Sequence, residues 1–460
     1  RVLFRSTDDI DISDEEWIPV GKSDHAFAGT FDGKGHTVSG MTIGTKDAPK
    51  SLSKDEVYMG FFGVLGGSAT VKDLTLTDVC IDTEGLASDY VGAIAGYTHS
   101  TDTGRNGAVI DSCTVKGTVS HTAEKGNQFT GGMIGYQYKG ALINSYFEGN
   151  VSCVVKAGDL AEAGGLVGLN NRGLVANCHT KADIYGSGNR DNGNEGMAVV
   201  SNLIAVQAGD LVHCFAQGNV TTKEYSTYAG MVSGWITGVG KTYQCGYSLD
   251  GTMIIGEDTS AKQIVDPVEA IGTKVSSGVN DEGEIYTGGL ADANIGYKKA
   301  DFAKAVESLN KTDEFPIDIA LYALDSNALK KWQMSEEELA YSEEYSKVIY
   351  VQPECEKVVK EEAVMKDGTW YGRNDEKTSV VKITVKDHAV TETTVVSGGS
   401  DGDAYNSAVE KAKTKASYGD DTGYGSGDTS VFAGGSGTKE DPYRIADKDQ
   451  LVYLSSSVNA

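Results

Sequence analysis

Gly165-Leu166-Val167-Gly168 is one of six copies of a short pattern between Met59 and Ile255, in which two apolar residues lie between two small ones. The other copies are Gly60-Phe61-Phe62-Gly63, Gly92-Ala93-Ile94-Ala95, Gly132-Met133-Ile134-Gly135, Ala198-Val199-Val200-Ser201 and Gly230-Met231-Val232-Ser233. Successive copies start 32, 40, 33, 33 and 32 residues apart. A pattern that returns at nearly constant spacing predicts a repeat array.

A second repeated position follows each copy after a short apolar pair. It is occupied by Leu74, Cys113, Tyr146, Cys178, Cys214 and Cys245, at steps of 39, 33, 32, 36 and 31 residues. Because Cys alternates there with an aromatic and an aliphatic residue, we predict that the position is interior and that Cys acts as a small apolar side chain. Stacked thiols would lie roughly 4.8 Å apart in parallel orientation, so we expect free, buried cysteines. No C-x-x-C pair is present, which argues against a zinc ribbon or a thioredoxin-like site.

A period of about 33 residues also suits helical repeats, but the residue content excludes them. The segments VKDLTLTDVCI and ALINSYFEGNVSC alternate apolar and polar residues, and no amphipathic helix of about twelve residues fits between the glycines. The sequence therefore predicts a mainly β chain whose strands stack in parallel on the next repeat, a β-solenoid. The insertions near Thr103 and from Gly186 are expected to form loops, and binding is expected there or on one flat face.

The residues also carry a family resemblance. Gly165-Leu166-Val167-Gly168 resembles the motif that names the GLUG-repeat surface proteins, and Asp9 to Gly44, with W-x-P-x-G and F-x-G-T-F-D-G-x-G-H-T, is similar to the leader of such arrays. The resemblance covers about residues 8–345. It implies a right-handed parallel β-helix on secreted or wall-anchored bacterial proteins, including the non-catalytic region of immunoglobulin A1 protease-like polypeptides. It does not itself imply catalysis.

The changes of pattern along the chain predict its domain organisation. We interpret residues 1–7 as an assembly artefact or a disordered start, and residues 8–296 as the β-helix of GLUG-like repeats. Residues 297–350 predict a helical and strand segment that closes the β-helix, because Phe302, Ala305, Val306 and Leu309 share one helical face. Residues 351–418 predict a small α+β module, and 419–435 a flexible linker. Residues 436–460 resemble the segment that precedes the leader in GLUG arrays, and are predicted to start a second, truncated repeat domain.

Composition limits the class of partner. The 460 residues carry a net charge of −26, so an acidic surface repels both nucleic acid and anionic lipid, and we expect neither as a partner. No apolar run of about 18 residues is present, so we expect no membrane insertion of this fragment. The 58 glycines and 6 prolines suit tight turns between short strands.

Candidate site residues are few. His36, within FDGKGHT, is interpreted as a turn or core histidine in the light of the family resemblance. The acidic residues Asp9, Asp11, Asp14, Glu15 and Glu16 are interpreted as a solvated edge, with calcium in the acidic loops as the alternative.

Two further motifs lie near the C-terminus. Gly398-Gly399-Ser400-Asp401-Gly402 matches G-x-S-x-G, but that mechanism needs a histidine after the serine and the last histidine is His388. The D-G-T-W-Y-G opening at Asp367 weakly resembles small flavin-binding surface modules, yet their S-G-A-T segment has no counterpart, so a spacer role is expected. We therefore predict no catalytic, cofactor-binding or metal-binding residues, and no cofactor.

These features favour a non-enzymatic bacterial surface protein, an adhesin or a structural stalk, located outside the cell or on its wall. We expect a monomer whose partner is a host or matrix protein or a glycan. One alternative is a polysaccharide-processing enzyme, because β-helices carry such sites in grooves. Another is a non-catalytic segment of an immunoglobulin-cleaving metalloprotease; no H-E-x-x-H occurs in this sequence. Tyr97, Tyr136, Tyr138 and Trp235 form a possible aromatic stripe, interpreted as core.

Overall fold

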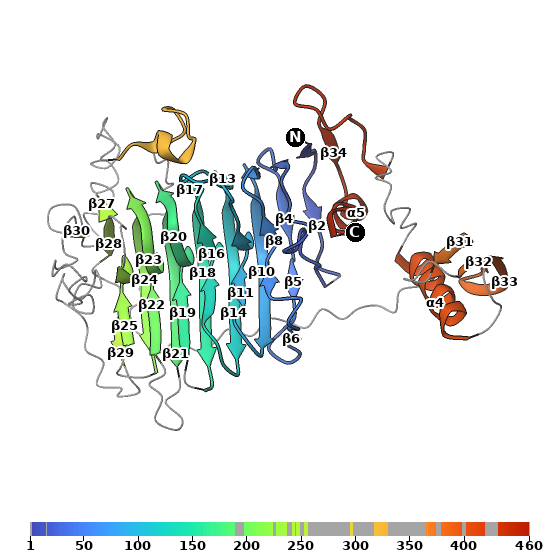
Figure 1. Cartoon of the computed structure of the whole chain (residues 1–460), viewed down its shortest axis with the longest axis horizontal. Coiled ribbons are helices and arrows are strands. Elements are labelled where there is room, and N and C mark those ends of the chain that lie inside the picture. The colour runs from blue at the N-terminus through green and yellow to red at the C-terminus, as the bar shows by residue number, and fades with distance from the viewer. Residues whose placement is uncertain are drawn as a thin grey trace.

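The computed structural model describes residues 2–14, 16–157, 159–188, 197–223, 227–236, 242–243, 245–248, 253–255, 295–297, 317–329, 365, 367–373, 379–397, 402–418 and 431–459 (Figure 1). The described residues are mainly β-strand, as the sequence predicts. Their parallel sheets curl around one large apolar core cluster that extends from Phe4 to Leu454.

Most described strands belong to three parallel sheets. The first sheet holds β1 (Leu3–Ser6), β3 (Thr30–Asp32), β8 (Phe62–Leu65), β9 (Thr70–Lys72), β12 (Ala95–Thr98), β13 (Val109–Asp111), β16 (Ile134–Tyr138), β17 (Ala141–Ile143), β20 (Val167–Ala176), β23 (Ile204–Val212), β26 (Ser233–Ile236), β27 (Thr242–Tyr243) and β34 (Tyr443–Ile445). The second holds β2 (Ile10–Asp11), β4 (Thr37–Ser39), β5 (Thr42–Ile43), β6 (Lys50–Ser51), β10 (Thr75–Gly85), β14 (Thr114–Ala123), β18 (Tyr146–Val155), β21 (His179–Gly188), β24 (Phe215–Thr222), β28 (Gly246–Ser248), β29 (Met253–Ile255) and β30 (Ile295–Tyr297). The third holds β7 (Tyr58–Met59), β11 (Tyr90–Gly92), β15 (Gln128–Gly131), β19 (Leu160–Gly164), β22 (Met197–Ser201) and β25 (Thr227–Gly230).

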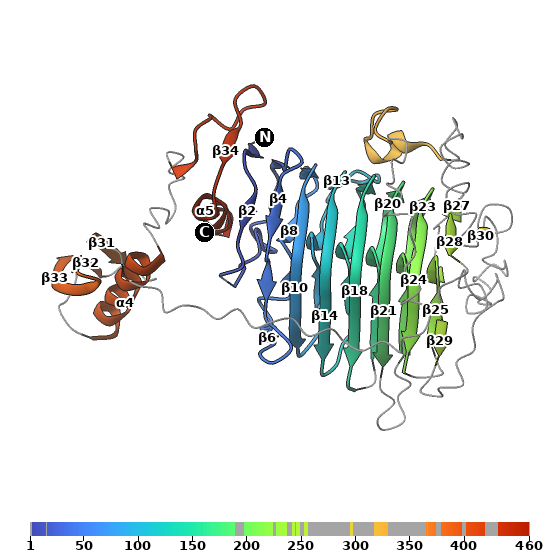
Figure 2. The ribbon, with the colours of Figure 1, turned by 180° about the vertical axis from the view of Figure 1, so that it is seen from behind.

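Strands of successive repeats pair in parallel, each on the equivalent strand of the next repeat. In the second sheet Val115 lies opposite Phe147, and Phe147 lies opposite Thr180. Figure 2 shows these long strands side by side from β10 to β24. Residues at equivalent positions therefore form columns along the stack, and a residue's column decides whether it packs in the core.

The columns correct the alignment of the small-residue pattern. Gly92 is the register partner of Gly131, and Gly131 that of Gly164, so the third and fourth copies begin one residue earlier than the sequence suggests. Ser201 is the partner of Gly164, whereas Ala198 is the partner of Ala161, so the fifth copy begins at Ser201. The adjacent glycines of the third and fourth copies made the alignment from sequence ambiguous. A Cβ on Gly164 would lie 2.0 Å from the carbonyl oxygen of Val167, which explains the small residue here.

The second repeated position is interior, as predicted, but one member is wrong. Tyr146 pairs with Thr114, not with Cys113, and the residue in the cysteine column is Ser145, whose hydroxyl accepts a hydrogen bond from the Cys113 N–H at 3.1 Å. Asn144, with φ of 52°, makes the preceding turn and sets this frame. Cys113, Cys178, Cys214 and Cys245 are buried and form no disulfide, as predicted.

Residues 3–6, within the segment interpreted as an artefact or a disordered start, form a strand; the artefact interpretation itself stays untested. Strand β1 pairs in parallel with β3, with Leu3 opposite Thr30 and Phe4 opposite Phe31. Phe4 is buried in the main core. In the leader, Trp17 stacks on Phe61 at 4.9 Å and donates its indole N–H to the Phe61 carbonyl. Residues 3–17 are thus part of the first repeat.

Only part of the predicted closing segment lies in the described residues. The predicted helical face from Phe302 to Leu309 lies outside them. Residues 317–329, which include the short 3-10 helix η3 (Ile319–Tyr322), cover an apolar patch formed by β17, β20 and β23. Arg105 and Tyr322 both donate hydrogen bonds to the Asp210 carboxylate, at 2.8 and 2.7 Å. This segment covers one side of the stack.

The described part of residues 351–418 forms an α+β unit. Strands β31 (Gly368–Arg373), β32 (Val380–Lys386) and β33 (Ala389–Ser397) form an antiparallel sheet that packs on helix α4 (Gly402–Tyr418). Asp387 and His388 have φ of 50° and 62°, as the tight hairpin between β32 and β33 requires. No described helix is long and apolar enough to cross a bilayer.

The end of the chain packs on its beginning. Strand β34 pairs with β1, and helix α5 (Lys448–Asn459) lies beside the first strands (Figure 1). Residues 431–435, predicted as linker, are instead packed, with Phe432 in the main core. The start of a second repeat domain at residue 436 stays a prediction.

Candidate binding face

The strongest candidate site is a row of aromatic side chains shared by the first and third sheets. Tyr58, Tyr90 and Phe129 are register partners in β7, β11 and β15, and Tyr97 and Tyr136 are partners in β12 and β16. We call these five residues the aromatic face. Tyr97 and Tyr136 are partly exposed and belong to no buried core cluster, so the interpretation of the predicted stripe as core is wrong for these two residues.

The rings of the aromatic face contact one another: Tyr58, Tyr90 and Phe129 stack, and Tyr97 and Tyr136 are tilted by 54°. Centroids are 5.0 Å apart for Tyr58 and Tyr90, 5.0 Å for Tyr90 and Phe129, and 5.3 Å for Tyr97 and Tyr136. The Tyr136 hydroxyl also accepts a hydrogen bond from the Asn171 amide at 2.9 Å. Burial raises the pKa of Tyr97 and of Tyr136, so these phenols stay protonated at neutral pH and act as hydrogen-bond donors.

The same columns continue beyond the aromatic face. Tyr136 is followed by Leu169, Val206 and Trp235 in register, and Val199, Ala205 and Val206 form a small cluster with Trp235 packed against it. Tyr138, the other member of the predicted stripe, lies in the column of Asn171 and its ring receives the Lys139 ammonium at 4.9 Å from the centroid. The two columns thus form a mainly apolar strip across several repeats.

One carboxyl group interrupts this strip. Glu162 is the register partner of Phe129 and Val199 and is only 3% exposed. Its Oε2 atom has no hydrogen-bond partner, and burial raises the pKa of the Glu162 carboxyl well above its ordinary value. Sequence reasoning missed this residue. Aligning the strands as columns would have found it, since an acid there replaces an aromatic ring.

A cluster of four polar side chains lies inside the stack and is closed to solvent. Thr83 Oγ1 is 2.8 Å from His121 Nδ1, and His121 Nε2 is 2.9 Å from Gln128 Oε1 and 3.5 Å from Asp89 Oδ2. The grouping has the residue types of a nucleophile, a base and an orienting acid. However, the four side chains are at most 1% exposed. We assign the network to core packing, because no substrate reaches it.

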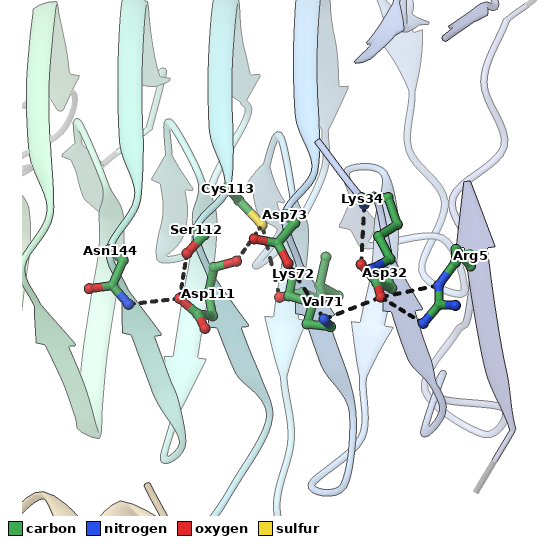
Figure 3. A network of polar contacts seen from close by, with 10 residues as sticks. All are labelled: Arg5, Asp32, Lys34, Val71, Lys72, Asp73, Asp111, Ser112, Cys113 and Asn144. Carbon is green, nitrogen blue, oxygen red and sulfur yellow. Dashed lines mark hydrogen bonds and ion pairs between the residues drawn. The ribbon is translucent and has the colours of Figure 1, made fainter. Parts of the chain in front are cut away.

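A network of polar contacts, the polar ladder, runs across the carboxyl ends of neighbouring strands β1, β3, β9 and β13 of the first sheet (Figure 3). Asp32, only 1% exposed, accepts from Arg5 Nη2 at 3.3 Å and pairs with Lys72 Nζ at 3.2 Å. Farther along, Asp111 accepts from the Asn144 amide at 2.7 Å. The contacts of Asp32 with Arg5 and Lys72, and that of Asp111 with Asn144, join neighbouring strands of the stack, so the ladder helps to hold the stack together.

The acidic cluster predicted near the N-terminus does not converge. Asp9 accepts from the Thr37 N–H, Asp11 accepts from the Ser13 N–H, and Asp14 pairs with Lys448. Glu16 pairs with Lys50 at 3.7 Å, while Glu15 lies outside the described residues. In the described ranges no group of three potential ligands could hold a metal ion.

The remaining candidate residues from the sequence do not form a site in the described part of the chain. His36 is partly exposed with its Nδ1 3.4 Å from Asp9 Oδ1, so it is a turn residue rather than a core residue. Ser400 lies outside the described residues. Asp367, which opens the segment that resembles a flavin module, accepts a hydrogen bond from the His388 N–H at 2.9 Å. It therefore helps to close the hairpin.

Comparison with known proteins gives partial matches. No family model matches the chain. A stretch of 100 residues, 22% of this chain, is 34% identical to a protein of Evansella cellulosilytica provisionally named a Gly-rich membrane protein, of which it covers 10%. A stretch of 113 residues, 25% of this chain, is 29% identical to halomucin of Haloquadratum walsbyi, of which it covers 1%. The chain thus spans a tenth or less of these curated relatives.

One solved structure is similar. It is the crystal structure of a protein from Bacteroides ovatus provisionally named an immunoglobulin A1 protease. The match has a TM-score of 0.44 and 17% identity, and it covers 66% of this chain and 80% of that one.

Proposed function

We propose that this chain is a repeat segment of a bacterial secreted or cell-surface protein, and that its three parallel sheets are the faces of a right-handed β-helix of the GLUG type. Parallel pairing between neighbouring repeats supports a solenoid. The role that suits it is non-enzymatic: an adhesin or stalk whose outer surface binds a host or matrix glycan or protein.

The aromatic face carries the binding part of this proposal. Aromatic side chains combine a large apolar area with a polar tip, and they lose little conformational freedom on binding. Here they recur at the repeat spacing, which suits an elongated ligand with its own repeat. The net charge of −26 disfavours polyanions. We therefore favour a neutral glycan chain, which would accept hydrogen bonds from the phenols of Tyr97 and Tyr136.

A glycan array with three forms of the chain tests this. The wild-type chain is expected to bind neutral glycans, and the double variant Tyr97→Ala/Tyr136→Ala is expected to lose at least tenfold in affinity. Leu86→Ala is the matched control, because Leu86 is an apolar side chain that is 66% exposed outside the aromatic face. Binding that survives in the double variant, or no binding by the wild-type chain, would refute the assignment.

A polysaccharide-processing enzyme is the second candidate, and Glu162 is the observation that favours it. A carboxyl group kept protonated by burial has the property of a general acid. Glycoside hydrolysis usually needs a second carboxyl group about 5 to 9.5 Å away, and Glu162 is the single acid in the described strand positions of these two columns. Release of reducing ends by the wild-type chain but not by Glu162→Gln would establish the enzyme reading.

The third alternative, a non-catalytic segment of an immunoglobulin-cleaving metalloprotease, stays a prediction. It requires an H-E-x-x-H motif in a longer protein that contains this chain, which sequencing of the whole gene would reveal.

A further inference from the structure

The segment 431–459 closes the N-terminal end of the stack. Strand β34 adds to the first sheet with Phe4 opposite Tyr443 and Ser6 opposite Ile445. The main core cluster includes Phe432, Ile445, Leu451, Tyr453 and Leu454. Figure 2 shows β34 and α5 beside β2, at the opposite end of the stack from β27 and β28. The cap therefore supplies both a strand and an apolar helix face.

The end surface is built for such a cap. Without β34, strand β1 would be the edge of the first sheet and would expose its backbone hydrogen-bonding groups. Phe4 would also lose its ring neighbours Phe432 and Tyr443, whose centroids are 5.5 and 5.6 Å away. An uncapped end of this kind pairs readily with another chain.

Helix α5 docks through specific polar contacts. The Asn459 side chain accepts from the Gly21 N–H and donates to the Pro19 carbonyl, both at 2.8 Å. Ser455 donates to the Ile18 carbonyl at 2.7 Å, and Lys448 pairs with Asp14 at 2.7 Å. The contacts of Ser455 and Asn459 are with backbone groups between Ile18 and Gly21, and the Lys448–Asp14 ion pair adds a side-chain contact at the other end of the helix.

All these partners belong to the first repeat, so the cap recognises one end surface. The cap sits about 438 residues from its partners in sequence, as in the contact of Gly21 with Asn459. It follows residues 419–430, whose composition, GDDTGYGSGDTS, is polar and rich in glycine. The same contacts are therefore open to the end surface of another copy, since nothing in them requires that both sides belong to one chain.

We propose that the N-terminal end of this chain is a docking surface for residues 431–459 of a second copy. Exchange of an identical segment costs little, because every contact of the closed monomer is remade. The surfaces are different on the two sides, so reciprocal exchange between two copies closes a dimer, whereas one-way exchange leads to longer open chains. A polar, glycine-rich tether of this length is expected to give the attached segment an effective concentration on the order of millimolar, so exchange is expected at high protein concentration.

Crosslinking across the Asp14–Lys448 pair tests the exchange. Both side chains are accessible, with exposures of 66% and 25%. Chains with Asp14→Cys and chains with Lys448→Cys are mixed at concentrations from micromolar to millimolar and treated with a short bismaleimide. A covalent dimer that increases with concentration is expected only in the mixture. Each single variant alone and the wild-type chain are the controls, since the other cysteines remain in all of them.

The double variant Asp14→Cys/Lys448→Cys shows whether the pair is close within one chain, because it yields a crosslinked monomer at low concentration. Efficient crosslinking of that monomer with no dimer in the mixed sample at any concentration overturns the proposal. A chain lacking residues 420–429 gives an independent readout. Shortening the connection is expected to hinder closure within one chain and to double the mass measured by light scattering, whereas an unchanged monomer mass argues against exchange.

Discussion

Substitution of Glu162 by Gln should change the pH dependence of stability. Folding raises the pKa of this carboxyl group, because burial among apolar side chains disfavours its charged form. The folded chain then holds the proton more tightly than the unfolded chain. The stability contribution is therefore fully present below the unfolded pKa, about 4.3, and is lost as the pH rises toward the higher folded pKa. Within that window the loss is about 1.4 kcal/mol per pH unit.

Urea denaturation followed by circular dichroism, at about pH 5 and about pH 6, measures this effect. The free energy of unfolding of Glu162→Gln, relative to wild type, should rise by about 1.4 kcal/mol between the two pH values. Groups common to both proteins cancel in the comparison. Glu124→Gln is the control: Glu124 is 54% exposed and pairs with Lys156, so its difference from wild type should stay constant. Parallel curves for wild type and Glu162→Gln would refute the assignment of a protonated carboxyl.

Four further predictions concern the stack. The Cβ of Gly132→Ala would lie 2.1 Å from the Gly165 carbonyl oxygen, so this variant should lower the free energy of unfolding by about 1 to 3 kcal/mol in urea denaturation. Gly66→Ala is its control: the nearest atom is 3.5 Å away, and the free energy of unfolding should change by less than about 1 kcal/mol. Arg105→Met should cost about 1.5 to 3 kcal/mol in the same assay, because it removes a charged donor from Asp210. Burial lowers the pKa of His179 to about 3, so the wild-type chain should lose up to about 1.4 kcal/mol per pH unit as the pH falls below about 6.5, and His179→Phe should lack this slope. Thermal unfolding with calcium and with EDTA should coincide if the acidic cluster is a solvated edge, and a large shift would establish ion sites.

Spacing was enough to predict a stacked β chain, because the columns repeat every 30 to 40 residues and each copy has the same small-residue corner. The frame of the corner was less secure. Gly131 and Gly132 are both small, and only pairing with Gly164 shows which of them occupies the first position. The sequence pointed to Tyr146 in the cysteine column because Tyr146 is more apolar than its neighbour Ser145. Only the pairing of Tyr146 with Thr114 shows that Ser145 occupies that column.

Features that depend on distant contacts had no local signal. Tyr97 and Tyr136 are residues of a type that is often found in cores. Their partial exposure depends on how the first and third sheets are arranged. The pairing of β1 with β34 joins residues more than 400 positions apart, which no period in the sequence encodes. Glu162 is one acid among 66, and becomes notable only when Phe129 and Val199 are placed beside it.

The tight corner between the third and first sheets means that the repeat motif reports a requirement of the backbone and carries no information about binding. Gly60 and Gly164 are required because a methyl group there would lie 2.1 and 2.0 Å from a carbonyl oxygen of the backbone. Selection at these positions therefore acts on whether the chain can bend, and it does not depend on what contacts the aromatic face. Relatives gathered by this motif alone will share a way of folding. Under the proposed binding role, changes in specificity are expected at the positions of Tyr97, Tyr136 and Glu162.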